Sequence, residues 1–98
     1  MEGVEWDPVK ARMNLRQHRV SFLEAVTVFS DPLGITIFDP EHSHEEDRYI
    51  TIGASASGRI LMVAHTDRAE RIRIINARKL TRSERRAYED EIQKRSGR

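Results

Sequence analysis

Cysteine is absent from the 98 residues of this sequence. Without thiols, the chain can form neither a disulfide framework nor a zinc site built from thiolates. Every apolar run falls short of the roughly 20 residues that a membrane-spanning helix requires. Residues 1–8 are acidic and short, unlike a signal peptide. We therefore expect a soluble cytoplasmic protein.

Several catalytic signatures are also missing. The sequence contains no Gly-rich phosphate loop, no zinc-finger spacing, no Ser-His-Asp arrangement with a recognisable turn and no carboxylate pair in an apolar setting. These absences exclude nucleotide hydrolases and glycosidases. A chain of 98 residues with 38% hydrophobic content supports one modest core, so we expect a single domain over residues 1–98.

Positive charge, by contrast, is concentrated late in the chain. Residues 59–98 contain twelve Lys or Arg against six Asp or Glu, whereas residues 1–58 contain five against ten. Residues 71–90 alone hold six arginines and one lysine. This asymmetry indicates a surface for a polyanion, although arginines on a C-terminal helix are also common on ordinary solvated surface.

The first third of the chain is predicted to be mainly helical. Asp7 and Pro8 suit an N-cap and the first position of a helix. Ser21 and Glu24 form a capping box in front of an apolar run, which predicts a second helix, and an Asp-Pro pair at residues 31–32 ends it. The expected elements are a strand at residues 4–6 and helices at 8–17 and 22–29.

After residues 31–32 apolar residues mostly alternate with other residues, and this pattern predicts four consecutive strands. Ile50 and Ile52 are expected to point into the core, and the mostly short links favour an antiparallel meander. A capping box formed by Thr81 and Glu84 begins a final, mainly polar helix. The prediction is an α+β fold. Its expected strands are 34–38, 48–52, 59–66 and 71–75, and its last helix covers 82–95.

The fourth of these strands is the first candidate site. Side chains at i and i+2 share a face of a strand, so Arg71 and Arg73 project together, opposite Ile72 and Ile74. If residues 67–70 link neighbouring strands, His65 lies close to Arg71. Guanidinium groups bind phosphate through two hydrogen bonds, and an imidazole exchanges protons near neutrality, so this cluster suits RNA. Alternatively, His65 simply hydrogen-bonds neighbouring backbone.

Two other histidine positions carry weaker signals. His18 ends the first helix, where a cation at the free carbonyls is as plausible as a catalytic group. The loop of residues 41–47 combines histidines with carboxylates, which are ligands for zinc or manganese. Because no distant partner fixes their geometry, a solvated acidic loop is preferred to a metal site.

Four segments resemble, in order and spacing, the BrnT family of bacterial type II toxins. They lie within residues 4–89 and read VEWDPVKARMNLRQHRVSFLEAVTVFSDP, EEDRYITIG, GRILMVAHTDR and RIRIINARKLTRSERRAYE. The resemblance implies a RelE-like fold and a metal-independent ribonuclease that needs no cofactor and arrests growth. It also implies a BrnA-type antitoxin with a ribbon-helix-helix region, expected to form a heterotetramer with the toxin and to bind operator DNA.

The chain departs from the family pattern at two positions. Arg19 stands where the family usually has glycine after His18, and Asn76 stands where serine is common. Glycine suits the left-handed turn that ends a helix, so Arg19 is expected to be strained by roughly 1 kcal/mol.

These observations together predict cleavage of RNA by its own 2′-hydroxyl, which leaves a cyclic phosphate. Arg71, Arg73 and Arg78 are expected to bind the scissile phosphate, where removing one well-aimed donor costs about 3 to 4 kcal/mol. His65 is expected to act as base or acid.

Further RNA contacts are expected from Arg59, Arg85 and Tyr88. Surface ion pairing is the alternative for Arg85, and packing is the alternative for Tyr88. The competing function is a basic module that binds RNA or an acidic protein partner without cutting. Arginines serve either function, because phosphate and carboxylate accept the same guanidinium fork.

Overall fold

The structure, a computed structural model, describes residues 3–96 and has an α+β architecture. The helices are α1 (Pro8–His18), α2 (Phe22–Val26) and α3 (Arg82–Ser96), with 3-10 turns η1 (Thr27–Ser30) and η2 (Pro40–His42). The strands are β1 (Val4–Glu5), β2 (Ile35–Phe38), β3 (Arg48–Ala54), β4 (Ile60–Arg68) and β5 (Arg71–Lys79).

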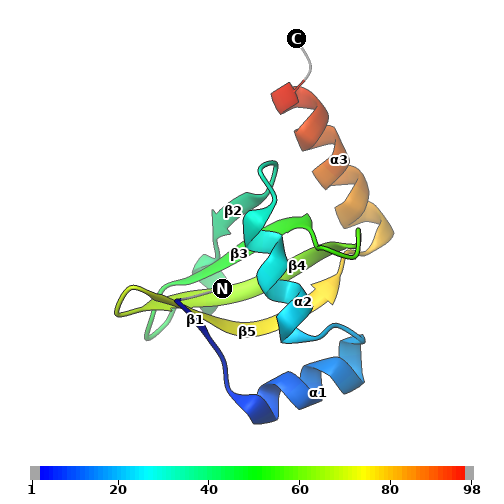
Figure 1. Cartoon of the computed structure of the whole chain (residues 1–98). Coiled ribbons are helices and arrows are strands. Elements are labelled where there is room, and N and C mark those ends of the chain that lie inside the picture. Colours follow the sequence, from blue (N-terminus) through cyan, green and yellow to red (C-terminus); the bar gives the residue numbers. More distant parts are fainter. Residues whose placement is uncertain (1–2, 97–98) are drawn as a thin grey trace.

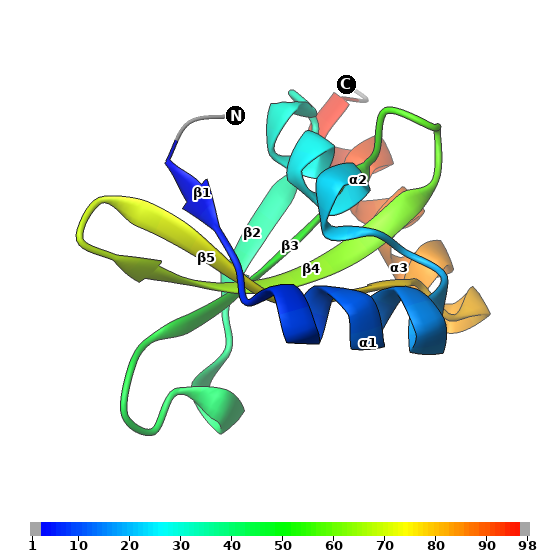
Figure 2. The ribbon, with the colours of Figure 1, turned by 60° about the horizontal axis from the view of Figure 1, so that its bottom comes forward.

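The helices are arranged around the sheet. In Figures 1 and 2, α2 lies over one face of the sheet, α1 runs beside β5, and α3 leaves the end of β5 toward the other side. None of the helices within residues 3–96 is long and apolar enough to cross a membrane.

The sheet has five strands in the order β1-β5-β4-β3-β2. Strands β2 to β5 are consecutive antiparallel neighbours, as expected for a meander, but these four strands are not the whole sheet. The short β1 pairs in parallel with β5, so the sheet is mixed. A strand of only two residues carries too short a pattern to reveal its pairing, and here the pairing is reinforced by the Ile72 N–H, which donates to the Gly3 carbonyl at 2.7 Å.

The predicted helix starts are confirmed by side-chain caps. Asp7 accepts a hydrogen bond from the Val9 N–H at 2.8 Å, and Ser21 accepts one from the Glu24 N–H at 3.0 Å. The helix that begins at Phe22 is α-helical only to Val26 and continues as the 3-10 turn η1. The expected helix over residues 22–29 is therefore a short α-helix followed by a tighter 3-10 turn.

At the end of α1, Arg19 has φ 60° and ψ 31°, the left-handed conformation expected at this position. Its N–H donates to the Leu15 carbonyl at 2.9 Å, which closes the helix. The Arg19 side chain itself is exposed.

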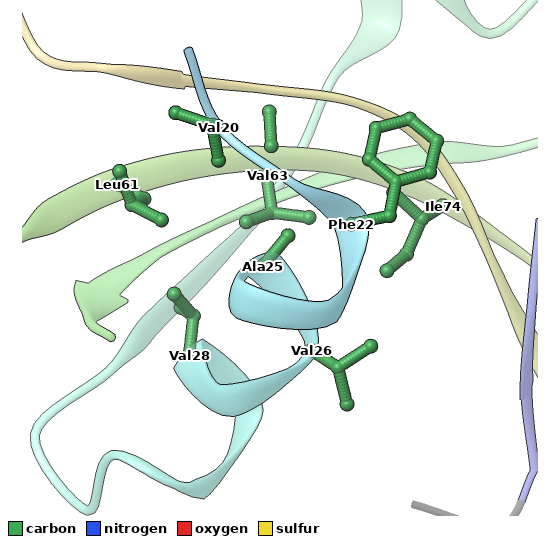
Figure 3. Close-up of a cluster of buried hydrophobic side chains, with 9 residues drawn as sticks. Val20, Phe22, Ala25, Val26, Val28, Leu61, Val63 and Ile74 are labelled. Atoms are coloured by element: carbon green, nitrogen blue, oxygen red, sulfur yellow. The ribbon is translucent and has the colours of Figure 1, made fainter. Parts of the chain in front are cut away.

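The core lies between α2, η1 and one face of the sheet, here called the inner face (Figure 3). Trp6 joins it through an edge-to-face contact with Phe22 at 6.0 Å. The opposite, outer face of β3 carries Ile50 and Ile52, so their expected inward placement is wrong. Gly53 on the inner face explains this, because a Cβ there would lie 3.1 Å from a Val28 methyl. The buried apolar cluster consists of Val20, Phe22, Ala25, Val26, Val28, Leu61, Val63, Ile74 and Ala77.

A bulge in β5 changes the direction of its side chains. His65 lies opposite Ile74 and Ala64 lies opposite Asn76, so Ile75 is the extra residue. Because a bulge shifts the alternation by one residue, Ile74 and Ala77 both point into the core. For the same reason Arg73 and Arg78 both lie on the outer face, although their spacing in an unbroken strand would put them on opposite faces.

Asn14 attaches α1 to the edge of β5. Its amide nitrogen donates to the carbonyls of Val20 at 2.9 Å and Ala77 at 2.8 Å, and its Oδ1 accepts from the Ala77 N–H at 3.1 Å. Strand β1 pairs only with Ile72 and Arg73, so it does not reach Ala77. The buried Asn14 side chain therefore supplies the hydrogen bonds that a further strand would make at this edge.

Candidate nucleic-acid interface

One row of polar residues crosses three strands of the outer face. Arg48 of β3 lies opposite Thr66 of β4, and Thr66 lies opposite Arg73 of β5. With strands about 4.8 Å apart, the Cα atoms of the two arginines are roughly 10 Å apart, within reach of one phosphate for side chains of this length. Arg78 lies farther along β5, opposite Met62. The outer face thus combines a basic end with an apolar centre.

The arginines predicted to bind phosphate already have carboxylate partners. Arg73 donates to Glu5 at 2.9 Å, and Arg71 lies 4.0 Å from the same carboxylate. Arg78 forms a two-pronged pair with Glu84, at 2.8 and 3.0 Å. These pairs fix the guanidinium groups in place, and each guanidinium has five N–H donors, so further donors remain for a phosphate.

Glu84 links the end of β5 to the start of α3. Besides Arg78, its carboxylate accepts from the Thr81 N–H at 2.9 Å, which completes the predicted capping box. The hydrogen bonds from Arg78 and then from Thr81 lower the pKa of Glu84 to about 2. The Arg78 position is therefore tied to the helix that follows it.

Arg48 is a candidate that the sequence did not single out. Its Nε is buried and has no hydrogen-bond partner among residues 3–96, and within that range Arg48 forms no ion pair, in contrast to Arg73 and Arg78. A buried donor left without a partner costs about 1–3 kcal/mol. The sequence places Arg48 on the same strand face as Ile50 and Ile52, but it predicts that this face points into the core.

His65 does not lie with the arginines. Its side chain is on the inner face, 5% exposed, with its ring 5.0 Å from Phe29 and 6.0 Å from Tyr49. Nε2 is 2.7 Å from the Thr51 hydroxyl, and burial is the main cause of a lowered pKa, opposed by the charge of Asp67.

The expected closeness of His65 and Arg71 is therefore wrong. A tight turn at Ala69 and Glu70, both with positive φ, pairs Arg71 with Arg68 instead. The expected four-residue link at 67–70 would have placed the strands in another register.

Arg59 and Arg85 are brought together beside Lys79, where they line a depression of about 210 Å³. Arg59 is engaged by Glu24, with Nε at 3.0 Å from the carboxylate, and it also donates to the Arg19 carbonyl at 3.1 Å. The hydrogen bond from Arg59, followed by those from two serines of the β3–β4 turn, lowers the pKa of Glu24 to about 2. Arg85 pairs with Glu89 at 3.1 Å, the alternative left open for it.

Tyr88 is 8% exposed and packs at a cavity of about 610 Å³ beside Leu33, Ile60 and Ile92. Burial, with a smaller contribution from Asp31, raises its pKa. This environment is that of a packing residue, and its ring is not presented for base stacking.

His18 lines a groove of about 360 Å³ between α1 and β5, together with Lys10 and Arg78. The structure thus places His18 near one predicted phosphate ligand, but at the opposite end of β5 from Arg71 and Arg73. Among residues 3–96, which include the 41–47 loop, no three His, Asp or Glu side chains are grouped to hold a metal ion.

The chain is a small α+β domain whose outer sheet face carries arginines from β3 and β5. Residues 6–84 match the model of the family described as BrnT, the ribonuclease toxin of type II toxin-antitoxin systems. The chain therefore belongs to the BrnT family, and membership of a type II toxin family implies an antitoxin partner.

The fold is similar to the crystal structure of the Brucella abortus ribonuclease toxin BrnT. The TM-score is 0.59 at 20% sequence identity, over 81% of this chain and 96% of that chain. A comparison with curated proteins found no match.

Proposed function

We propose that this chain is a metal-independent endoribonuclease in which the 2′-hydroxyl of RNA attacks the neighbouring phosphate and leaves a cyclic phosphate. Family membership supports ribonuclease activity. The observation that carries the site assignment is the shared orientation of Arg73 and Arg78 on the outer face, which results from the bulge at Ile75. Chemistry of this kind requires cations at the phosphate, which arginines supply.

In this proposal the arginines bind separate phosphates of one strand. Arg73 and Arg78 are five residues apart, which corresponds to roughly 15 Å along a strand. Arg71 adds charge beside Arg73, and Arg59 and Arg85 extend the positive surface around the start of α3. We assign His65 to the fold, because its bond to Thr51 joins β4 to β3 inside the core.

The proposed partner is a BrnA-like antitoxin with a ribbon-helix-helix region, assembled with the toxin as a heterotetramer that binds operator DNA. Covering the outer face would explain neutralisation directly, because the phosphate ligands lie there. The proposal places the activity in the cytoplasm, where it inhibits translation, and treats residues 1–98 as one RelE-like domain.

The test is incubation of purified, antitoxin-free protein with total RNA in excess EDTA, followed by analysis of the product ends. We expect 2′,3′-cyclic phosphates from the wild type and a rate about 10²–10³-fold lower in Arg73→Ala. Arg95→Ala is the matched control, because Arg95 has a similar carboxylate partner, Glu91 at 3.0 Å, but lies in the last turn of α3.

Three outcomes would contradict parts of this proposal. RNA that is shifted on a gel but never cut would favour the non-catalytic binding module. Cleavage that requires a divalent cation would refute metal independence. Equal rates for Arg73→Ala and Arg95→Ala would leave a nuclease whose phosphate site lies elsewhere.

A further inference from the structure

Cleavage by a 2′-hydroxyl needs a group that accepts a proton, and His65 is enclosed on the inner face. A different imidazole lies beside the Arg48 end of the outer face. His42 Nδ1 is 2.7 Å from Asp39 Oδ2, and the side chains are 64% and 16% exposed, respectively. A half-buried carboxylate at Nδ1 orients the ring and leaves Nε2 directed away from it.

The loop that carries this pair is fastened to Arg48. The Asp39 N–H donates to the Arg48 carbonyl at 2.9 Å. Ser43 Oγ accepts from the Arg48 N–H at 2.8 Å and donates to the Asp39 carbonyl at 2.6 Å. Because these bonds close the loop at its base, the Asp39–His42 pair has a fixed position relative to the start of β3.

His42 and Arg48 line the same pocket, of about 320 Å³, with His44, Glu45 and Glu46. The pKa of Glu46 is lowered mainly by its hydrogen bond from Arg68, with further contributions from the charges of Arg48 and Arg73. The charges of Arg48 and Arg73 therefore act on Glu46, which links this pocket electrostatically to the Arg48–Thr66–Arg73 row. It combines an oriented imidazole with a guanidinium that lacks a carboxylate partner in residues 3–96.

We propose that His42, oriented by Asp39, is the residue that exchanges protons with RNA, and that Arg48 binds the scissile phosphate. This inference rests on the proposed nuclease function. His42 Nε2 takes the proton of the 2′-hydroxyl, a bond forms between the 2′-oxygen and phosphorus, and the bond from phosphorus to the 5′-oxygen breaks. The 5′-oxygen leaves with the electron pair and takes a proton from water, and the His42 imidazolium returns its proton to solvent.

Asp39 has a defined part in this step as a positioning residue. As the acceptor at Nδ1, it selects the tautomer whose Nε2 carries a lone pair, and it stabilises the imidazolium formed after proton transfer. The other charged or titratable groups facing His42 in the pocket are His44, Glu45, Glu46 and Arg48.

The experiment compares His42→Gln with Glu41→Gln in the metal-free RNA assay. Glu41 is the adjacent exposed residue of η2, so this control alters the same turn without touching the Asp39–His42 pair. We expect His42→Gln to lower the cleavage rate about 10²–10⁴-fold, the usual contribution of a general acid or base. RNA binding in a gel shift should be unchanged in His42→Gln and weakened in Arg48→Ala.

A purely structural role for His42 is separated by chemical rescue. Added imidazole should restore cleavage to His42→Gly but not to Arg48→Ala. Wild-type cleavage with an unaffected His42→Gln, or a loss that follows His44→Gln instead, would overturn the assignment and leave the nuclease standing. Absence of wild-type cleavage would refute the proposed function itself.

Discussion

Replacing Arg19 with glycine is expected to stabilise the protein, because Arg19 holds the left-handed conformation at φ 60° and its side chain is exposed. A non-glycine residue in this region costs about 1–2 kcal/mol. Glycine also increases the conformational entropy of the unfolded chain, which stabilises the unfolded state by about 0.4–1 kcal/mol and offsets part of this gain. The expected net gain in the free energy of unfolding is therefore about 0.5–1 kcal/mol, or a Tm higher by about 2–8 °C for a domain of this size.

The assay is urea unfolding of the wild type, Arg19→Gly and Arg19→Ala. Alanine keeps the Cβ and therefore the strain, so Arg19→Ala should match the wild type within about 0.5 kcal/mol. The bond between the Arg19 carbonyl and Arg59 involves only the backbone of Arg19 and is present in all three proteins. If Arg19→Gly were no more stable than Arg19→Ala, the strain argument would be refuted.

Two further predictions concern stability. Asn14→Ala should lower the free energy of unfolding by about 2–3 kcal/mol in urea, because it leaves the buried Ala77 N–H and carbonyl without their partner; a loss below about 0.5 kcal/mol would show that water satisfies this edge. The pKa of Glu24 is lowered from 4.5 to about 2 in the folded protein, so its contribution is present above pH 4.5 and is lost as pH falls from there toward 2. Unfolding followed over that range should show a smaller loss in Glu24→Gln than in the wild type.

Local signals in the sequence were sufficient for the helix starts and for most of the strands. Asp7 and Ser21 bond to backbone groups two or three residues away, so the residues that form each cap are adjacent in the chain. The bulge at Ile75 and the turn at Ala69 and Glu70 had no such signal. Neither site contains glycine, the residue that usually marks a bulge or a left-handed turn. Both features depend on how β4 pairs with β5.

The same distinction explains the site. The density of charge predicts an arginine-rich site, but only the bulge places Arg73 and Arg78 on one face. His65 does not share that face, because it lies opposite Ile74 in the antiparallel pair, whereas Arg73 lies opposite Thr66. Arg48 and His42 were not selected, because their relation depends on contacts that close the loop of residues 39–48 and not on any spacing typical of a known motif.

The carboxylate partners of the outer-face arginines also bear on what this surface selects. Glu5 holds Arg73, and Glu84 holds Arg78 with both prongs of its guanidinium. A small anion at one of these arginines shares the guanidinium with a carboxylate and gains a single interaction, whereas a nucleic-acid strand presents a charge at every nucleotide and gains from releasing its counterions at each contact. Arg48 has no ion-pair partner among residues 3–96, so in the proposed site its charge is shared with no carboxylate. A strand held first at Arg48 would then compete for Arg73 and Arg78 as an intramolecular ligand, which favours a polyanion over free phosphate.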